Sequence, residues 1–328
     1  MAAIIYPSAL EYWLKETGIP YYFHFDKDSC AVKNKEVLQM ASTRSEISHA
    51  IDWLCFTAPV HVAVSRHTRR NNKESIIFHK MPDHLPEHSF YKITDEIYIA
   101  SPELCFIQAA CELSVSQLIL LANDLCAIYV KDTLEEYGQR RRNPVTDTKT
   151  LKTYLNKAGQ VRGIRNARSL IRHVSDRSNS PMESRLAVLA ALPLSRGGYG
   201  LIKPQLNLNI PLSKATSEYT GITSCCCDMV WKTQKVILEY DSNLSHLDIR
   251  QHFKDKQRST ALALDGFKVI SITAEQLSSF HNVERTFLGI RDSLKMQTHK
   301  DRMESYFSLR WKVVHEILQI NDPTRFHL

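Results

Sequence analysis

A strand–turn–strand–helix–strand pattern in the last third of this 328-residue chain constrains its fold more than any other feature. Cys227–Trp231 and Lys235–Asp241 are short apolar runs separated by a polar turn, a pattern typical of a β-hairpin. A helical stretch, His246–Leu264, follows, and Asp265-Gly266 ends it before a further apolar run, Phe267–Ile272. A strand that returns after a helix lies parallel to its neighbour in the same sheet. We therefore expect a compact α/β layer built on a mixed sheet.

Two carboxylates lie on the second strand of this hairpin, where packing alone does not explain them. Side chains alternate between the faces of a strand, so Glu239 and Asp241 share a face with Ile237. An unpaired ionised carboxylate in a buried strand costs several kcal/mol, so a cation is the expected partner. Asp228, on the first strand, can reach the same place. Oxygen ligands of this kind favour Mg²⁺ or Mn²⁺ over zinc.

A third acidic residue of interest stands at a predicted helix start. Ser180-Pro181-Met182-Glu183 begins a helix whose apolar stripe continues through Leu186 and Leu189. Serine at the cap and glutamate three residues later also form a capping box, which satisfies free backbone amides by itself. Glu183 therefore has two interpretations, a helix cap and a metal ligand.

In order, these segments resemble the very-short-patch-repair-like branch of the PD-(D/E)XK nuclease superfamily. The resemblance covers about Ser180 to Thr273 and rests on Ser180–Glu183, Asp228, Val236–Asp241, His246, Asp255–Arg258 and Asp265–Ile270. In that family a helix Glu, a hairpin Asp and a strand Glu hold a divalent metal beside the scissile phosphate. The resemblance implies a restriction-endonuclease-like sheet flanked by helices, an Mg²⁺ (or Mn²⁺) cofactor, and hydrolysis of DNA. It also implies that Glu183, Asp228 and Glu239 are catalytic metal ligands.

The chain departs from the superfamily pattern at Asp241. A lysine usually stands two residues after the strand acid, and the aspartate here resembles the Glu-x-Asp variant of the branch. We predict that Asp241 belongs to the site and that His246 or Lys256 supplies the missing positive charge. Lys254 and Arg258 are further candidates on the same predicted helix. Alternatively, Asp255 and Arg258 form only a local ion pair.

Positive charge gathers in the middle of the chain. The formal net charge is +7, and from Gly138 to His173 a single acid, Asp147, accompanies ten basic residues. These are Arg140, Arg141, Arg142, Lys149, Lys152, Lys157, Arg162, Arg165, Arg168 and Arg172. Apolar spacing predicts two amphipathic helices, Asp147–Ala158 and Ile164–Val174. A solvated helix usually mixes charge signs and gains about 0.2–0.5 kcal/mol per pair. We therefore predict that the arginines bind a nucleic-acid backbone; the alternative is a solvated helical connector.

The N-terminal third predicts a separate α/β domain. Val60–Val64 and Ser75–Phe78 are expected to pair as strands, with Glu96–Ile99 as a third. The basic segment Ser65–Lys73 between the first two is either a solvated hairpin tip or a phosphate-contacting loop. His61 and His79 lie in the strand-like runs, as expected of core or edge residues. Core helices are expected from Ser101-Pro102 and from Ser116 to about Tyr129.

The layout of this region resembles abortive-infection antitoxin-type regulators of bacteria. The resemblance is carried by Pro59–Val64, the basic loop, Ile97–Leu104 and two helices ahead of a nuclease-like domain. It implies a bacterial defence or toxin–antitoxin context and a protein partner for the N-terminal domain. It also leaves open a non-catalytic, nucleic-acid-binding regulator with a nuclease fold. A third alternative is an interaction protein, such as an antitoxin whose N-terminal part binds a partner, and it would expose an apolar patch in its first 135 residues.

We expect an α/β fold (α+β overall) in four segments. These are an N-terminal α/β domain for regulation or binding at 1–135, a basic helical connector at 136–178, a nuclease-like domain at 179–295 and a C-terminal helix at 296–328. The eight cysteines lack regular disulfide spacing and are expected to be small buried residues in a reducing compartment. No apolar run approaches the ~18–20 residues of a membrane-spanning helix. The sequence thus predicts a cytoplasmic protein with no membrane partner.

Overall fold

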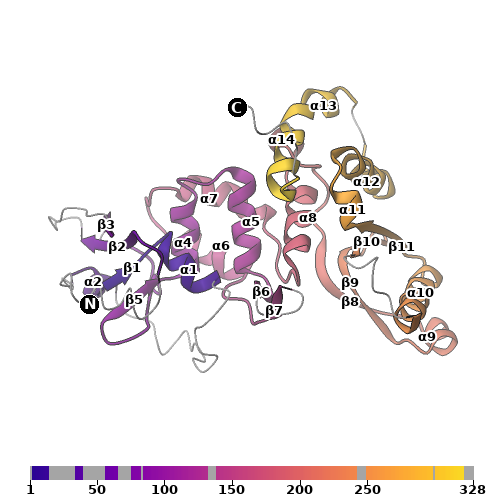
Figure 1. The fold of residues 1–328 in the computed structure, drawn as a ribbon, viewed down its shortest axis with the longest axis horizontal. Coiled ribbons are helices and arrows are strands. Elements are labelled where there is room, and N and C mark those ends of the chain that lie inside the picture. Colours follow the sequence, from indigo (N-terminus) through magenta and orange to yellow (C-terminus); the bar gives the residue numbers. More distant parts are fainter. Residues whose placement is uncertain are drawn as a thin grey trace. The chain divides into compact units, whose positions relative to one another are not determined.

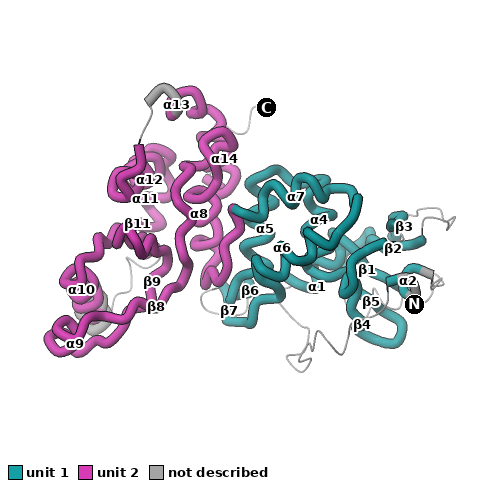
Figure 2. The backbone as a smooth tube through the Cα atoms, turned by 180° about the vertical axis from the view of Figure 1, so that it is seen from behind, with its two compact units in different colours: residues 1–172 teal, residues 173–328 magenta. Residues whose placement is uncertain are grey.

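The computed structural model describes residues 2–14, 34–39, 56–65, 75–82, 84–131, 138–241, 249–297 and 300–320 (Figure 1). The chain forms two compact units, Met1–Arg172 (unit 1) and His173–Leu328 (unit 2), shown in teal and magenta in Figure 2. Both combine sheets with helices, as expected of an α/β protein. The unit boundary falls inside the segment expected as a connector, 136–178, most of which belongs to unit 1.

Unit 1 contains a five-stranded mixed sheet with the strand order β3-β2-β1-β5-β4. The strands are β1 (Ala2–Ile4), β2 (Val60–Ser65), β3 (Ile76–Met81), β4 (Phe90–Lys92) and β5 (Ile97–Ala100). The three strands expected here are confirmed, and β2 pairs with β3. However, β2 and β3 are parallel, so the chain between them is not a hairpin. A parallel pair cannot be joined by a tight turn. The basic residues expected there, Arg66, His67, Arg69, Arg70 and Lys73, lie outside the described residues.

The helices of unit 1 surround α4 (Pro102–Ala109), whose residues are buried except for Gln108. Its start is the predicted one, because Ser101 Oγ accepts a hydrogen bond from the Leu104 amide at 3.1 Å. The next helix, α5 (Val115–Leu125), is capped by Ser114 and is shorter than expected. Tyr129 does not end it but begins β6 (Tyr129–Lys131), which pairs with β7 (Gln139–Arg141).

Four further helices complete unit 1. They are α1 (Ser8–Leu14), α2 (Asn34–Gln39), α6 (Thr148–Lys157) and α7 (Ile164–Leu170), the last followed by a 3₁₀ turn, Ile171–His173. The two amphipathic basic helices are thus confirmed as α6 and α7. Both helices pack against α4, and Leu151 and Leu155 of α6 and Ala167 of α7 are buried. The apolar stripes of α6 and α7 therefore serve the core of unit 1, while most of their basic residues stay exposed.

Unit 2 contains a four-stranded mixed sheet with the order β11-β10-β9-β8. The strands are β8 (Gln205–Pro211), β9 (Ser224–Trp231), β10 (Val236–Asp241) and β11 (Lys268–Thr273). The predicted hairpin is β9–β10, and β11 runs parallel to β10 after α10 (Ile249–Leu264), as expected. One core cluster joins the sheet to α10 and contains Ile210, Cys225, Cys227, Val230, Ile237 and Leu262. Cys225 and Cys227 are thus the small buried residues expected, whereas Cys226 is exposed.

The remaining helices of unit 2 include the C-terminal ones. They are α8 (Pro181–Ala191), α9 (Lys214–Thr220), α11 (Ala274–Leu277), α12 (Phe280–Ser293), α13 (Lys300–Ser305) and α14 (Phe307–Leu318). The expected C-terminal helix is formed by α13 and α14, and α14 packs against α8 and α12. It is therefore part of unit 2. None of the described helices is long and apolar enough to cross a membrane.

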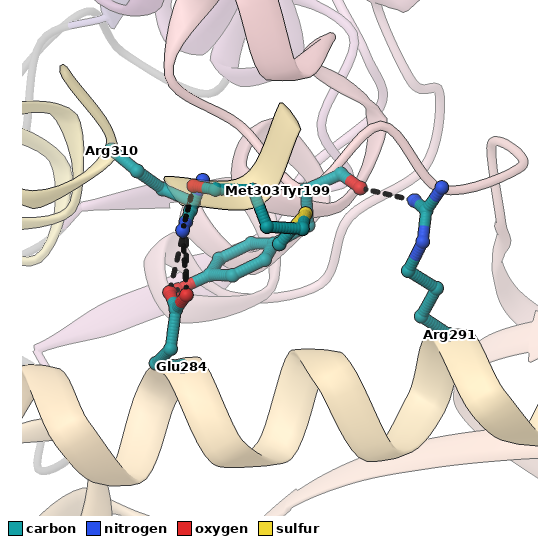
Figure 3. Close-up of polar contacts among 5 residues, drawn as sticks. All are labelled: Tyr199, Glu284, Arg291, Met303 and Arg310. Atoms are coloured by element: carbon teal, nitrogen blue, oxygen red, sulfur yellow. Dashed lines mark hydrogen bonds and ion pairs between the residues drawn. The ribbon is translucent and has the colours of Figure 1, made fainter. Parts of the chain in front are cut away.

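A buried ion pair connects α12 and α14 (Figure 3). Arg310 is 1% exposed and donates from Nη2 to Glu284 Oε1 at 2.7 Å and from Nε to Oε2 at 2.9 Å. Tyr199 donates its hydroxyl to Glu284 at 2.9 Å and stacks on Phe287 with ring centroids 4.4 Å apart. The carboxylate of Glu284 therefore connects α12 both to α14 and to the segment that carries Tyr199.

Candidate functional site

Glu183 stands in the first turn of α8, which begins as predicted. Ser180 Oγ accepts a hydrogen bond from the Glu183 amide at 3.2 Å, and Pro181 occupies the first helical position. The carboxylate of Glu183 is not on the surface, because the residue is only 5% exposed. Its Oε2 accepts hydrogen bonds from the Asn179 amide at 2.8 Å and from the Asn207 side chain of β8. Glu183 is therefore more than a cap: it connects α8 to the sheet.

Asp228 and Glu239 meet across the β9–β10 hairpin. The regular pairing of the two strands extends to Leu238 opposite Met229. Beyond it, Asp228 Oδ2 accepts a hydrogen bond from the Tyr240 amide at 2.9 Å, and the Asp228 amide lies 3.4 Å from Glu239 Oε2. The two carboxyl groups are thus adjacent, as the sequence predicts for residues on facing strands.

The pKa values of all three carboxyl groups are raised. Burial raises the pKa of Glu183 to about 7, and the charge of Asp228 adds to the effect. Burial, followed by the charge of Asp228, raises the pKa of Glu239 to about 8. Burial also raises the pKa of Asp228 itself. Asp228 is therefore the shared neighbour of the other two, and loss of contact with water, together with the charge of Asp228, disfavours the charged forms of Glu183 and Glu239.

One oxygen in this cluster lacks a hydrogen-bond partner. Glu239 Oε1 is buried, and no donor among the described residues bonds to it. Arg258 of α10 places a positive group near it, with Nη2 3.8 Å from Oε1, beyond hydrogen-bonding distance. The same Nη2 donates to the Cys226 carbonyl at 2.7 Å. The guanidinium is therefore held by the backbone and satisfies Glu239 only in part.

A pocket of about 230 Å³ opens beside Glu239, between β10, α10 and β11. Asp241 and Arg258 also line it, so Glu239 and Asp241 border the same pocket. Of the expected cations that the structure describes, Arg258 lines this pocket and Lys254 and Lys256 do not. Lys254 and Lys256 are exposed on α10, and His246 lies outside the described residues.

The three-ligand arrangement expected from the resemblance is not fully formed. Over the described part of the chain, no three His, Cys, Asp or Glu side chains are grouped as metal ligands. Glu183 is instead bound to Asn207 and Asn179. Mg²⁺, however, is commonly held by one or two carboxylates, with waters and phosphate oxygens as further ligands. The adjacent pair Asp228 and Glu239, with its unpartnered oxygen, fits such a site.

The basic residues of the middle segment divide into two groups. Arg142 donates to the carbonyls of Trp13 at 2.5 Å and Asp124 at 2.9 Å, and burial lowers its pKa to about 10. Arg168 donates to the carbonyls of Leu155 and Ala158 at the end of α6. These bonds argue against Arg142, and in part against Arg168, as phosphate contacts. Arg140 is partly buried, and Arg141, Arg162, Arg165 and Arg172 are exposed.

Sequence reasoning missed Asn207, which holds the Glu183 carboxylate. It lies between Leu206 and Leu208 on β8, where an alternating pattern indicates an ordinary solvent-facing residue. Its left-handed backbone, with φ of 48°, also has no signal in the sequence. Comparisons of the chain with protein-family models, with curated proteins and with solved structures found no significant match. The functional argument therefore depends on the geometry of the site itself.

Proposed function

We propose that this chain is a metal-dependent endonuclease-like protein that hydrolyses phosphodiester bonds in DNA. The observation that carries the proposal is the partly buried pair Asp228 and Glu239, in which the oxygen Glu239 Oε1 is buried without a hydrogen-bond donor among the described residues. A buried carboxylate oxygen without a partner is costly unless a cation or donor completes it. Mg²⁺ or Mn²⁺ is the cation that such a set of hard oxygen atoms favours.

The order of elements in unit 2 supports the same proposal. A helix that carries Glu183 is followed by a hairpin that carries Asp228 and Glu239, then by α10 and a parallel strand. This is the order of the segments from which the resemblance to the PD-(D/E)XK superfamily is drawn. A restriction-endonuclease-like sheet is thus part of the proposal, together with the roles of the three acids.

Each acidic side chain has a distinct role in this proposal. Asp228 and Glu239 would hold the ion, which when bound polarises a phosphoryl oxygen and lowers the pKa of an attacking water. Glu183, held by Asn207, is a positioning residue next to Asp228. Arg258 lines the same pocket as Asp241 and supplies positive charge where the superfamily has a lysine. The exposed arginines of unit 1 would bind the DNA backbone without reading its sequence.

A second candidate function is favoured by Arg258. Its position 3.8 Å from Glu239 also suits a metal-free ion-pair network that stabilises the fold. In that case the chain is a non-catalytic, nucleic-acid-binding regulator of the antitoxin type, and Asp241 marks the loss of the catalytic lysine. The two candidates differ in whether a divalent ion binds the carboxyl cluster and whether DNA is cut.

Cleavage of plasmid and single-stranded DNA by the full chain, with Mg²⁺, with Mn²⁺ and with EDTA, tests the proposal. We expect metal-dependent cleavage that Glu239→Gln reduces at least a hundred-fold. Glu218→Gln is the matched control, since Glu218 is an exposed carboxylate of the same unit that pairs with the exposed Lys214. DNA binding without cleavage under every metal condition would contradict the nuclease and support the regulator.

A further inference from the structure

A second pocket lies entirely within unit 1, between the turn before β4, α4 and α6. Its volume is about 410 Å³, within the range of small-molecule sites. No residue of the carboxyl cluster in unit 2 contributes to it. It therefore calls for an explanation that does not depend on the proposed nuclease activity.

A buried carboxylate lies at the floor of this pocket. Glu103 is 2% exposed, and its Oε1 accepts a hydrogen bond from the Thr146 hydroxyl. No hydrogen bond to its second oxygen is made by any other described residue. Tyr154 also lines the floor, but its hydroxyl already bonds to Ser89 at 2.6 Å. Glu103 is thus the floor group that can accept a hydrogen bond from a ligand in the pocket.

The rim of the pocket carries the opposite charge. Lys149 and Lys157 of α6 are exposed, and neither ammonium group pairs with a described residue. They lie two turns apart on one face of the helix, about 12 Å along its axis. Asp147 is not their counter-ion, because its carboxylate caps α6 by accepting from the Lys149 and Thr150 amides. Glu87 and His88 complete the rim with one acid and one imidazole.

This arrangement specifies a ligand with N–H donors at one end and an anion at the other. We propose that the pocket binds a guanosine phosphate, with the N–H donors of guanine on Glu103 and the phosphate on Lys149 and Lys157. Guanine presents two adjacent N–H donors, which suit a carboxylate acceptor, and the aromatic floor suits a planar base. The same chemistry is offered by a free mononucleotide and by a guanine unit of a nucleic-acid strand.

Calorimetric titration of the full chain with GMP, in EDTA, tests this site apart from any metal chemistry. We expect saturable binding at millimolar or lower concentration, about ten-fold weaker for IMP, which lacks the 2-amino group, and for guanosine, which lacks the phosphate. These ligand comparisons use the wild-type protein and therefore do not depend on whether a variant folds. Equal affinity for GMP, AMP and IMP would overturn the assignment of guanine to Glu103.

Variants locate the two ends of the ligand. Lys149→Ala with Lys157→Ala should weaken GMP but leave guanosine unchanged, whereas Lys152→Ala, on α6 but outside the pocket, should alter neither. Glu103→Gln should remove the preference for GMP over IMP. A 5′-phosphorylated dinucleotide beginning with guanine distinguishes the sources: tighter binding than GMP identifies a strand, and weaker binding a free nucleotide. Absence of saturable GMP binding, or affinity unaffected by the double lysine variant, would contradict the proposal.

Discussion

Replacing Glu284 by glutamine should destabilise unit 2 strongly. Arg310 is 1% exposed, and Glu284 accepts three hydrogen bonds from its guanidinium in addition to the Tyr199 hydroxyl. The variant leaves the guanidinium buried without a counter-charge. Removal of one partner of a buried ion pair typically costs about 3–5 kcal/mol in free energy of unfolding. That is a large part of the ~5–15 kcal/mol that stabilises a typical protein.

Hydrogen exchange of the amides in α12 and α14 measures this loss where it occurs. A cost of about 3 kcal/mol or more corresponds to exchange at least a hundred-fold faster in Glu284→Gln. Glu275→Gln, which changes an exposed carboxylate of α11, is the matched control and should leave the exchange rate within a few-fold of wild type. Acceleration of less than about ten-fold in Glu284→Gln would refute the reasoning, since it would mean that water replaces the carboxylate.

A double replacement separates loss of the pair from loss of packing. In Glu284→Gln/Arg310→Met no unpaired guanidinium remains, so part of the stability should return relative to Glu284→Gln alone. The Met303 carbonyl, which accepts from Arg310 at 3.0 Å, then loses its donor, so recovery should be incomplete. A double variant less stable than the single one would show that Arg310 contributes mainly through packing.

Two further predictions concern unit 1. Arg142→Ala should lower the free energy of unfolding by about 1.5–3 kcal/mol, through loss of charged hydrogen bonds to carbonyls, and should leave nucleic-acid affinity unchanged. Arg141→Ala, at an exposed neighbour, should leave the free energy of unfolding unchanged and weaken nucleic-acid binding. Denaturation and salt-dependent binding assays measure the two effects. His61 and His79 are joined by a 2.8 Å contact between Nδ1 and Nε2, and burial lowers both pKa values below 6.5. On acidification these histidines take up protons at a higher pH in the unfolded chain than in the folded one. The free energy of unfolding should therefore fall as the pH drops below 6.5 toward the lowered pKa values of the folded protein. Exchange rates of β2 and β3 amides, corrected for intrinsic pH effects, measure this, and an unchanged or rising stability on acidification would contradict it.

The helix starts and the β9–β10 hairpin could be predicted from the sequence because they depend on residues close together in the chain. Ser180 and Ser101 cap helices because a serine hydroxyl is placed to accept from an amide three residues later. The β9–β10 hairpin and the parallel β11 follow from alternation and from the helix between β10 and β11. The same logic placed Asp228 and Glu239 side by side, since facing strands bring such residues together.

The features that the sequence did not reveal depend on long-range packing. The parallel pairing of β2 with β3 is decided by the rest of the sheet, and two apolar runs do not encode its direction. Arg142 carries the same charge as Arg141, yet its bonds to Trp13 and Asp124 carbonyls exist only once α1 and α5 are in place. Asn207 became part of the site for a similar reason, because only the folded chain brings β8 to the start of α8.

The central claim, that Asp228 and Glu239 form a divalent-metal site, is tested most directly by calorimetric titration of the full chain with Mg²⁺ and with Mn²⁺. We predict saturable binding that weakens at least ten-fold in Glu239→Gln. Binding should also strengthen as the pH rises toward 8, because a proton competes with the metal for Glu239, whose pKa is raised to about 8. Absence of saturable binding at millimolar metal, both with DNA and without it, would contradict the claim and leave the cluster as an ion-pair network with Arg258.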